Sequence, residues 1–510
     1  MSFTRCLVLL LALSACKDEP PATPGPEAPL EPGNYEDTGP FATCGLRAGQ
    51  CGALSTFDTS ACAQSTLSGF TPEGAYAVQL RYLRNNQAVF GTAAMGLTTS
   101  GEPEWLGRRR VVSREVGPTT VFYQGEETLT DGSVRVRSYL GCRMAGADHL
   151  VGCFDECVDG ERAVRGTFQA RRVSRASGED EGSGLALVSE TAVDTGVPVD
   201  VYVTKGHAYV VSLRGGLYVY DVRDPAQPVL KTQVHQPSDN YWNGVWALGD
   251  ALYVASANRG VVVFDIGDPG APVLVRSVPA QLTNVHTVFV SGTHLYAAAQ
   301  EPAGAVLVFD VRDALQPVLI SKFQAEGFSA PAEGDGPHDM LVFEERLYVN
   351  FWGAGYVVAS MERPDEPAEL GRYRYQRSTS HATAVARYGD RLIAFEGSED
   401  WGAHLRVLDV TDPSDIRHLG EWRLREHVSI HNMVLVGTRL YLSHYHDGVR
   451  VLDVSVPETP RQVAYFNTFR PASPVQGISF YDGAIGIRVP GDGYVYTVDS
   501  SRGLLILREQ

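Results

Sequence analysis

The stretch Val261-Val-Val-Phe-Asp265 decides the fold, because similar stretches recur throughout the second half of the chain. Each is a short apolar run, and most end in aspartate. Successive copies begin 44 to 55 residues apart, a spacing that suits a four-stranded propeller blade. Seven copies can be aligned, and they begin at residues 217, 261, 306, 356, 405, 449 and 504. The repeat predicts an all-β, seven-bladed β-propeller over residues 185–510.

Two further features accompany the repeat. A second apolar strand precedes each copy, as in Leu252-Tyr-Val-Ala255, and the two strands of a pair are joined as a hairpin by a turn that contains glycine. An Asp-Pro turn follows several copies, as in Asp265-Ile-Gly-Asp268-Pro269. Its carboxylates are expected to accept hydrogen bonds from backbone N–H groups of the turn. Calcium binding by these acids is the alternative interpretation.

The strand pair, the glycine hairpin and the Asp-Pro turn together resemble the LVIVD-repeat family of bacterial β-propellers. The resemblance covers about residues 185–510 and departs from the family pattern at Ser360 and Arg508, where the repeated aspartate is missing. It implies an extracytoplasmic propeller and specifies no reaction.

The two ends of the repeat region predict how the ring closes. The last unit stops at Gln510, just after its third strand, while residues 185–193 resemble the outer strands of other units. We expect this N-terminal strand to complete blade seven, which removes two open sheet edges at once.

The N-terminus has the pattern of a bacterial lipoprotein signal. Arg5 precedes an apolar run from Cys6 to Leu13, which is too short to span a bilayer. The sequence Leu13-Ser-Ala-Cys16 resembles a lipobox, in which the cysteine is lipidated. We expect a signal peptide over residues 1–15, a lipid anchor at Cys16 and a tether rich in proline and acids over residues 16–40. The predicted location is periplasmic or cell-surface and membrane-anchored; an ordinary secretory signal is the alternative.

The remaining six cysteines all precede residue 160. An even number of cysteines in one region of an exported chain indicates up to three disulfides, with fifteen possible pairings. A zinc site that uses the last two of these cysteines is the alternative. Alternating apolar and polar residues predict a small, disulfide-braced antiparallel β domain over residues 41–175, followed by a linker at 176–184. The cysteines are Cys44, Cys51, Cys62, Cys142, Cys153 and Cys157.

Histidines provide the candidate functional site. Three of them lie ten residues before the repeat tyrosine, and a fourth lies twelve residues before the equivalent isoleucine. The first strand of each blade lines the central channel, so these side chains are expected to converge there. Neutral imidazoles bind transition metals. The candidate metal ligands are His286, His338, His381 and His431.

A purely structural role for these histidines is the alternative. Blades one and two carry Val199 and Asn243 at the corresponding position, so the ring of histidines is incomplete. If a metal binds, Asp339 and Asn432 are the candidate partners that would orient the imidazoles.

Charge and missing motifs limit the function. With 43 Lys and Arg against 60 Asp and Glu, a net charge of −17 disfavours nucleic acid as a partner. The chain has no nucleophile elbow, phosphate loop or H-E-x-x-H motif. The first hypothesis is a binding or scaffolding module at the cell envelope, with a membrane lipid anchor and a protein or small-molecule ligand on one propeller face. The alternative is a metal-dependent enzyme, with redox chemistry as one option, that uses the channel histidines.

Overall fold

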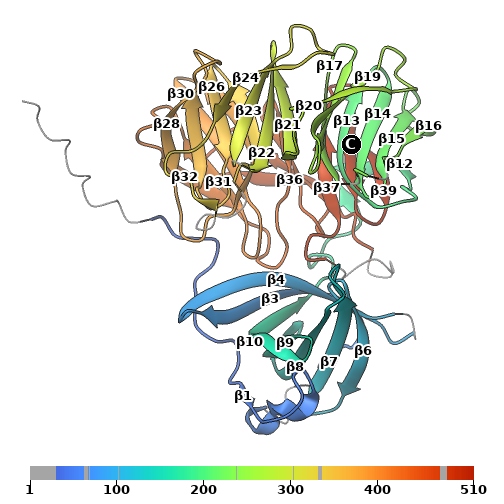
Figure 1. Cartoon of the computed structure of the whole chain (residues 1–510), viewed down its shortest axis with the longest axis vertical. Coiled ribbons are helices and arrows are strands. Elements are labelled where there is room, and N and C mark those ends of the chain that lie inside the picture. The colour runs from blue at the N-terminus through green and yellow to red at the C-terminus, as the bar shows by residue number, and fades with distance from the viewer. Residues whose placement is uncertain are drawn as a thin grey trace, which may run out of the picture.

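Two β architectures follow one another along the chain (Figure 1). The computed structural model describes residues 30–510 except 63–66, 68, 101–102, 237, 240, 303, 331–335 and 471–478. The predicted signal peptide, Cys16 and most of the predicted tether lie outside the described residues. In the described part of the chain, no helix is long and apolar enough to cross a membrane.

The first architecture is a closed eight-stranded antiparallel barrel. Each strand pairs with its neighbour in sequence, and β10 closes the ring on β3. The interior is filled by side chains such as Val78, Tyr139 and Phe168, so the barrel has an apolar core. The sequence predicted antiparallel strands here but not their closure. The strands are β3 (Gly74–Arg84), β4 (Gln87–Leu97), β5 (Trp105–Leu106), β6 (Arg109–Val116), β7 (Val121–Thr128), β8 (Val134–Gly146), β9 (His149–Val158) and β10 (Glu161–Arg172).

Residues 30–62 form a strap that begins against the propeller, where Glu31 bridges Tyr375, and then runs along the outside of the barrel (Figure 1). The strap contains the two-stranded sheet β1 (Gly45–Leu46) and β2 (Phe57–Asp58), and the single-turn 3-10 helices η1 (Leu54–Thr56) and η2 (Thr59–Ala61). Three disulfides fasten it, Cys44–Cys153, Cys51–Cys157 and Cys62–Cys142. The disulfide prediction is therefore confirmed, and the zinc alternative fails because both of its cysteines are in disulfides.

The second architecture is the predicted seven-bladed propeller. Each blade is an antiparallel sheet numbered here from its inner to its outer strand. Blade one is β13 (Val197–Thr204), β14 (His207–Leu213), β15 (Gly216–Asp221) and β16 (Val229–Val234). Blade two is β17 (Trp242–Leu248), β18 (Ala251–Ser256), β19 (Gly260–Asp265) and β20 (Val273–Val278). Blade three is β21 (Asn284–Ser291), β22 (His294–Glu301), β23 (Ala305–Asp310) and β24 (Val318–Phe323).

The remaining blades follow the same plan. Blade four is β25 (Asp339–Phe343), β26 (Arg346–Asn350), β27 (Tyr356–Ser360) and β28 (Ala368–Tyr373). Blade five is β29 (Ser380–Tyr388), β30 (Arg391–Ser398), β31 (Leu405–Asp409) and β32 (Arg417–Trp422). Blade six is β33 (Met433–Val436), β34 (Arg439–Ser443), β35 (Val449–Asp453) and β36 (Arg461–Phe466). Blade seven is β37 (Ala484–Arg488), β38 (Val495–Asp499), β39 (Gly503–Glu509) and the N-terminal strand β12 (Leu185–Thr191).

Ring closure occurs as predicted. Strand β12 pairs antiparallel with β39, with Leu187 opposite Leu507, and is the outer strand of blade seven. The short strand β11 (Gly182–Ser183) also adds a fifth strand to blade six, which the sequence did not predict. The chain thus joins both ends of the propeller through strand pairing.

The acids of the Asp-Pro turns cap their turns. Asp265 accepts a hydrogen bond from the backbone N–H of Gly267 at 2.8 Å, and Asp268 accepts one from Gly270 at 3.1 Å. The same pattern occurs in blades one and five. These bonds satisfy backbone donors that the turn leaves unpaired, which is the interpretation favoured from the sequence.

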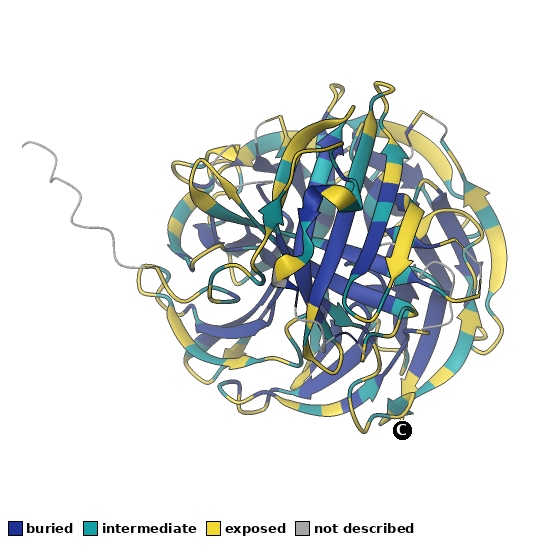
Figure 2. Cartoon of the chain, turned by 90° about the horizontal axis from the view of Figure 1, so that it is seen from below, coloured by how far each residue is buried: buried dark blue, intermediate teal, exposed yellow. Residues whose placement is uncertain are grey.

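The barrel packs against one face of the propeller. Ala75, Ala77 and Val173 of the barrel region form an apolar cluster with Trp401 and two phenylalanines of the propeller. Thr92 and Tyr481 also share a hydroxyl hydrogen bond of 3.3 Å across this junction. Figure 2, a view from the barrel side, shows buried strands in the interior and exposed residues along the outer rim.

Candidate metal centre

The structure brings the four predicted histidines together in an arc across blades three to six. His286 lies in β21, His381 lies in β29, and His338 and His431 lie just before β25 and β33. The distances between the centroids of neighbouring rings are 4.4 Å (His286 to His338), 5.2 Å (His338 to His381) and 4.5 Å (His381 to His431). The inner strands therefore place these imidazoles at one height of the channel.

Two overlapping sets of side chains could hold a metal ion. The first is His286, His338 and His381, and the second is His381, Glu399 and His431. Within each set, the potential ligand atoms all lie within 4.8 Å of one another. Metal–nitrogen bonds are about 2.0–2.1 Å long, so a small inward movement of the rings would complete coordination. His381 belongs to both sets and is the centre of the cluster.

The hydrogen bonds of His381 and His431 leave nitrogens available to an ion. Nδ1 of His431 lies 2.9 Å from the carbonyl oxygen of Ile485, so Nδ1–H donates to it and the lone pair is on Nε2. His381 is only 2% exposed, and its Nδ1 has no hydrogen-bond partner among the described residues. A buried polar atom without a partner is costly, and a bound ion would relieve that cost.

Amide side chains hold the other two histidines. Nδ2 of Asn243 lies 3.1 Å from Nε2 of His286, and Nε2 of Gln300 lies 3.2 Å from Nδ1 of His338. Nδ2 of Asn243 also donates to the carbonyl oxygen of His286 at 3.2 Å, which fixes the orientation of that amide. The amide of Gln300 can present its oxygen in place of its nitrogen by rotating through half a turn. With the oxygen inward, the amide accepts from the ring N–H and leaves the other ring nitrogen free to bind an ion.

Burial keeps the cluster neutral. It lowers the pKa of His286 to about 3 and those of His381 and His431 to about 4, and it lowers the pKa of His338 well below the usual value. Neighbouring imidazoles that become charged lower the pKa of His286 further. All four rings are therefore neutral at pH 7, which is the form that binds metals.

Three neighbours of the histidines were not predicted. Glu399 lies 3.5 Å from Nε2 of His381 and accepts a hydrogen bond from the hydroxyl of Tyr445. The indole of Trp352 stacks on His338 with a centroid distance of 4.4 Å. All three residues lie in turns between the second and third strands of their blades. Trp352 and Tyr445 occupy equivalent positions in turns of equal length, four residues after the repeat tyrosine, which is a signal that the sequence offered, whereas the turn of Glu399 is one residue longer.

The predicted orienting partners differ from those in the structure. Asp339 accepts a hydrogen bond from the backbone N–H of Met340 at 2.8 Å, and among the described residues neither Asp339 nor the Asn432 side chain has a hydrogen bond to an imidazole. The imidazoles are oriented by Asn243, Gln300 and a backbone carbonyl instead. The reason is register: a residue next to a histidine on a strand points to the opposite face.

The cluster lies near the face that the barrel covers. Trp401, two residues after Glu399, belongs to the apolar cluster between barrel and propeller. Tyr445 lies 5.1 Å from His431 and 5.4 Å from Tyr481, whose hydroxyl bonds to Thr92 of the barrel. Ring contacts therefore connect the histidine cluster to the barrel.

Comparisons with known proteins identify the repeat. Residues 196–236 and 241–279, which are blades one and two, match the LVIVD repeat family. No curated protein matches the chain. Similar solved structures include the WD40 β-propeller domain of Doa1 (13% identity, 64% of this chain and 97% of that chain, TM-score 0.47) and BamB from Moraxella catarrhalis (12%, 72% and 95%, 0.41). The chain is thus a seven-bladed β-propeller that carries LVIVD repeats.

Proposed function

We propose that this protein is an extracytoplasmic binding module, anchored to a membrane by lipid at Cys16, that holds a transition-metal ion with His286, His338 and His381. The observation that carries the metal proposal is the convergence of three imidazoles whose ligand atoms lie within 4.8 Å of one another. The partnerless Nδ1 of the buried His381 supports it independently.

The donor set limits the metal. Three neutral imidazoles suit copper, zinc, nickel or iron, whereas calcium and magnesium prefer oxygen ligands. Glu399 and His431 offer further donors beside His381. Three protein ligands leave a coordination position for water or a substrate. The same set therefore supports a metal-dependent enzyme, with redox chemistry as one option, as the second candidate function.

The envelope location is supported by two features of the chain. Three disulfides and a propeller with LVIVD repeats are consistent with an extracytoplasmic protein. The lipobox-like sequence at residues 13–16 supports the lipid anchor. Fractionation of cells that express the full chain or its Cys16→Ser variant tests the anchor. The wild type is expected in the membrane fraction and the variant in the soluble exported fraction; equal distribution of both would contradict the proposal.

Metal analysis of the purified full chain tests the site. The chain is loaded separately with Cu²⁺ and Zn²⁺, dialysed, and measured by mass spectrometry of the elements. A His338→Gln, His381→Gln double variant removes two of the three ligands, and glutamine keeps much of the side-chain volume. His235→Gln is the matched control, because His235 is exposed and lies outside the cluster.

The expected result is stoichiometric metal in the wild type and the control, and its loss in the double variant. Circular dichroism checks that both variants are folded. Nitrogen hyperfine structure in the electron paramagnetic resonance spectrum of the Cu²⁺ protein provides a second measurement on the wild type alone. Absence of metal from the wild type, or equal metal content in the double variant, would overturn the proposal.

A further inference from the structure

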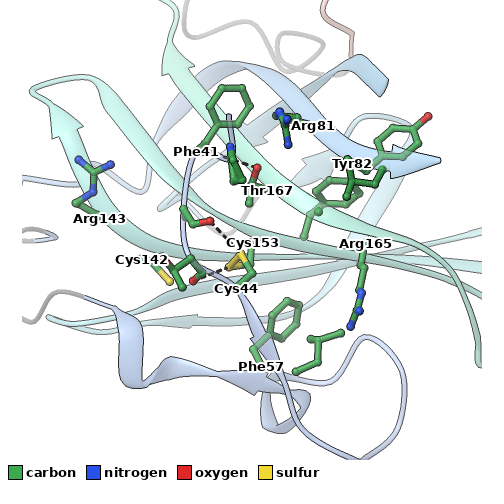
Figure 3. Close-up of a pocket in the computed structure, with 17 residues that line it drawn as sticks. Phe41, Cys44, Phe57, Arg81, Tyr82, Cys142, Arg143, Cys153, Arg165 and Thr167 are labelled. Atoms are coloured by element: carbon green, nitrogen blue, oxygen red, sulfur yellow. Dashed lines mark hydrogen bonds between the residues drawn. A yellow bond between two sulfur atoms is a disulfide. The ribbon is translucent and has the colours of Figure 1, made fainter. Parts of the chain in front are cut away.

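The barrel carries a cavity of about 940 Å³ on its outer side. It lies between residues 40–46 of the strap and strands β3, β8, β9 and β10 (Figure 3). The barrel interior itself is filled by apolar side chains. The space for a ligand is therefore created by the strap, and it falls within the size range of small-molecule sites.

The cavity wall is apolar and basic. Aromatic and aliphatic side chains, among them Phe41, Phe57 and Leu83, line it. Three arginines also line it, and no aspartate or glutamate is among its 17 lining residues (Figure 3). No carboxylate of the wall therefore opposes the binding of an anion.

The arginines differ in their availability. Arg81 donates two hydrogen bonds to Asp37 of the strap, at 2.8 and 3.0 Å, so its charge is already matched. Arg143 and Arg165 are exposed, and neither has an ion-pair or hydrogen-bond partner among the described residues. Figure 3 shows these two side chains on opposite sides of the Cys44–Cys153 disulfide. The cavity therefore has two free cationic groups at its edges and apolar surface between them.

The wall is also fixed before any ligand arrives. The Cys44–Cys153 disulfide joins the strap to β9, and the backbone N–H of Phe41 donates to the hydroxyl of Thr167 on β10 at 3.2 Å. A rigid wall lowers the entropy cost of binding. Neither the disulfides nor this hydrogen bond is needed to close the barrel, whose strands pair without the strap.

We propose that this cavity binds a single-chain amphiphile with a carboxylate head, of the fatty-acid class. The head is recognised by Arg143 or Arg165, because guanidinium groups bind carboxylates in a planar, two-point geometry. The chain lies along Phe41, Phe57 and Leu83, where burying each CH₂ group is favourable. The charge of the head group determines which amphiphiles bind. The arginines repel a cationic head, and a neutral amphiphile makes only the apolar contacts and so binds more weakly than the carboxylate. This site is separate from the proposed metal centre.

Fluorescence titration with 11-(dansylamino)undecanoic acid tests the proposal, and the methyl ester of the same probe is the neutral comparison. The Arg143→Gln, Arg165→Gln double variant removes both free charges. Arg110→Gln is the matched control, because Arg110 is an exposed arginine on β6 that does not line the cavity. Leu83→Glu, at a side chain that is 62% exposed and so tolerant of substitution, places a carboxylate at the cavity edge.

The acid is expected to bind the wild type and Arg110→Gln saturably and more tightly than the ester. The double variant should bind the acid up to about fivefold more weakly, consistent with the loss of the one exposed ion pair that the head forms, and should bind the ester unchanged. Leu83→Glu should also weaken binding of the acid selectively. No saturable binding of the acid below about 100 µM, a weak affinity, would overturn the proposal. So would equal affinities for acid and ester, or an unaltered double variant.

Discussion

Replacing His381 with glutamine should change how stability depends on pH. His381 is 2% exposed, and burial lowers its pKa to about 4, whereas the pKa of histidine in an unfolded chain is about 6.5. At a pH between these two pKa values, His381 binds a proton in the unfolded chain but not in the folded chain. The free energy of unfolding therefore falls as the pH drops from about 6.5 to about 4. At 1.36 kcal/mol per pKa unit, this one ring accounts for about 3 kcal/mol of that loss.

Urea unfolding of the metal-free protein at pH 7 and pH 4.5, followed by tryptophan fluorescence, measures this effect. Wild type and His381→Gln are compared at each pH. At pH 7 the variant should be the less stable of the two, and at pH 4.5 the gap should shrink or reverse by about 2–3 kcal/mol. The neighbouring histidines act in the same direction, because removing His381 takes away a charge that lowers the pKa values of His286 and His431.

The exposed His235 is the control for this experiment. His235→Gln should show the same difference from wild type at both pH values, because His235 is exposed and lies outside the histidine cluster. A gap between wild type and His381→Gln that does not change with pH would refute the reasoning. It would mean that His381 takes up a proton as readily in the folded chain as in the unfolded one.

Three further substitutions test the contacts that hold the molecule together. Cys51→Ser with Cys157→Ser should destabilise the barrel by about 2–4 kcal/mol in thermal unfolding and leave metal content unchanged; a loss of metal would show that the strap supports the propeller site. Asn34→Ala removes a buried side chain of the strap that accepts a hydrogen bond from Arg406 at 2.9 Å, which should cost about 1–3 kcal/mol and speed proteolysis of the strap; unchanged proteolysis would contradict this anchoring. Tyr445→Phe removes the hydroxyl that donates to the glutamate beside His381 and should lower stability by about 1–3 kcal/mol; an unchanged melting temperature would show that the bond has little effect.

The positions of the histidines were predictable because the blades share one register. Phe289 pairs with the repeat tyrosine Tyr296, and Val434 pairs with Tyr441. In blades three, four and six, counting ten residues back from the tyrosine crosses the hairpin and reaches the histidine on the inner-strand side. In blade five the histidine lies twelve residues before Ile393, two positions further from the hairpin. Sequence spacing therefore converts directly into height along the channel, and equal heights in adjacent blades bring side chains together. The same logic predicted that β12 would complete blade seven.

Part of the remaining site also follows the register, because Trp352 and Tyr445 each lie four residues after the repeat tyrosine, in five-residue turns of blades four and six. Glu399 does not, because its turn in blade five is one residue longer and that blade has Ile393 in place of the repeat tyrosine. The contact between Glu399 and Tyr445 joins residues 46 positions apart. Closure of the barrel could not be predicted from the sequence, because β5 is only two residues long and too short to show an alternation of apolar and polar residues. The strap's cavity likewise exists only because three disulfides, whose pairing the sequence left open, fix its path.

The incomplete ring of histidines, which from the sequence argued for a structural role, is consistent with a metal site once the flanking blades are considered. A transition-metal ion commonly takes four to six ligands, so seven converging imidazoles could not all bind one ion. At each end of the arc, the next blade carries a hydrogen-bonding group in place of a further histidine. Asn243 of blade two contacts His286 at one end, and the carbonyl of Ile485 in blade seven accepts from His431 at the other. The blades without histidine thus supply the groups that orient the outermost rings, and the missing imidazoles do not count against a bound ion.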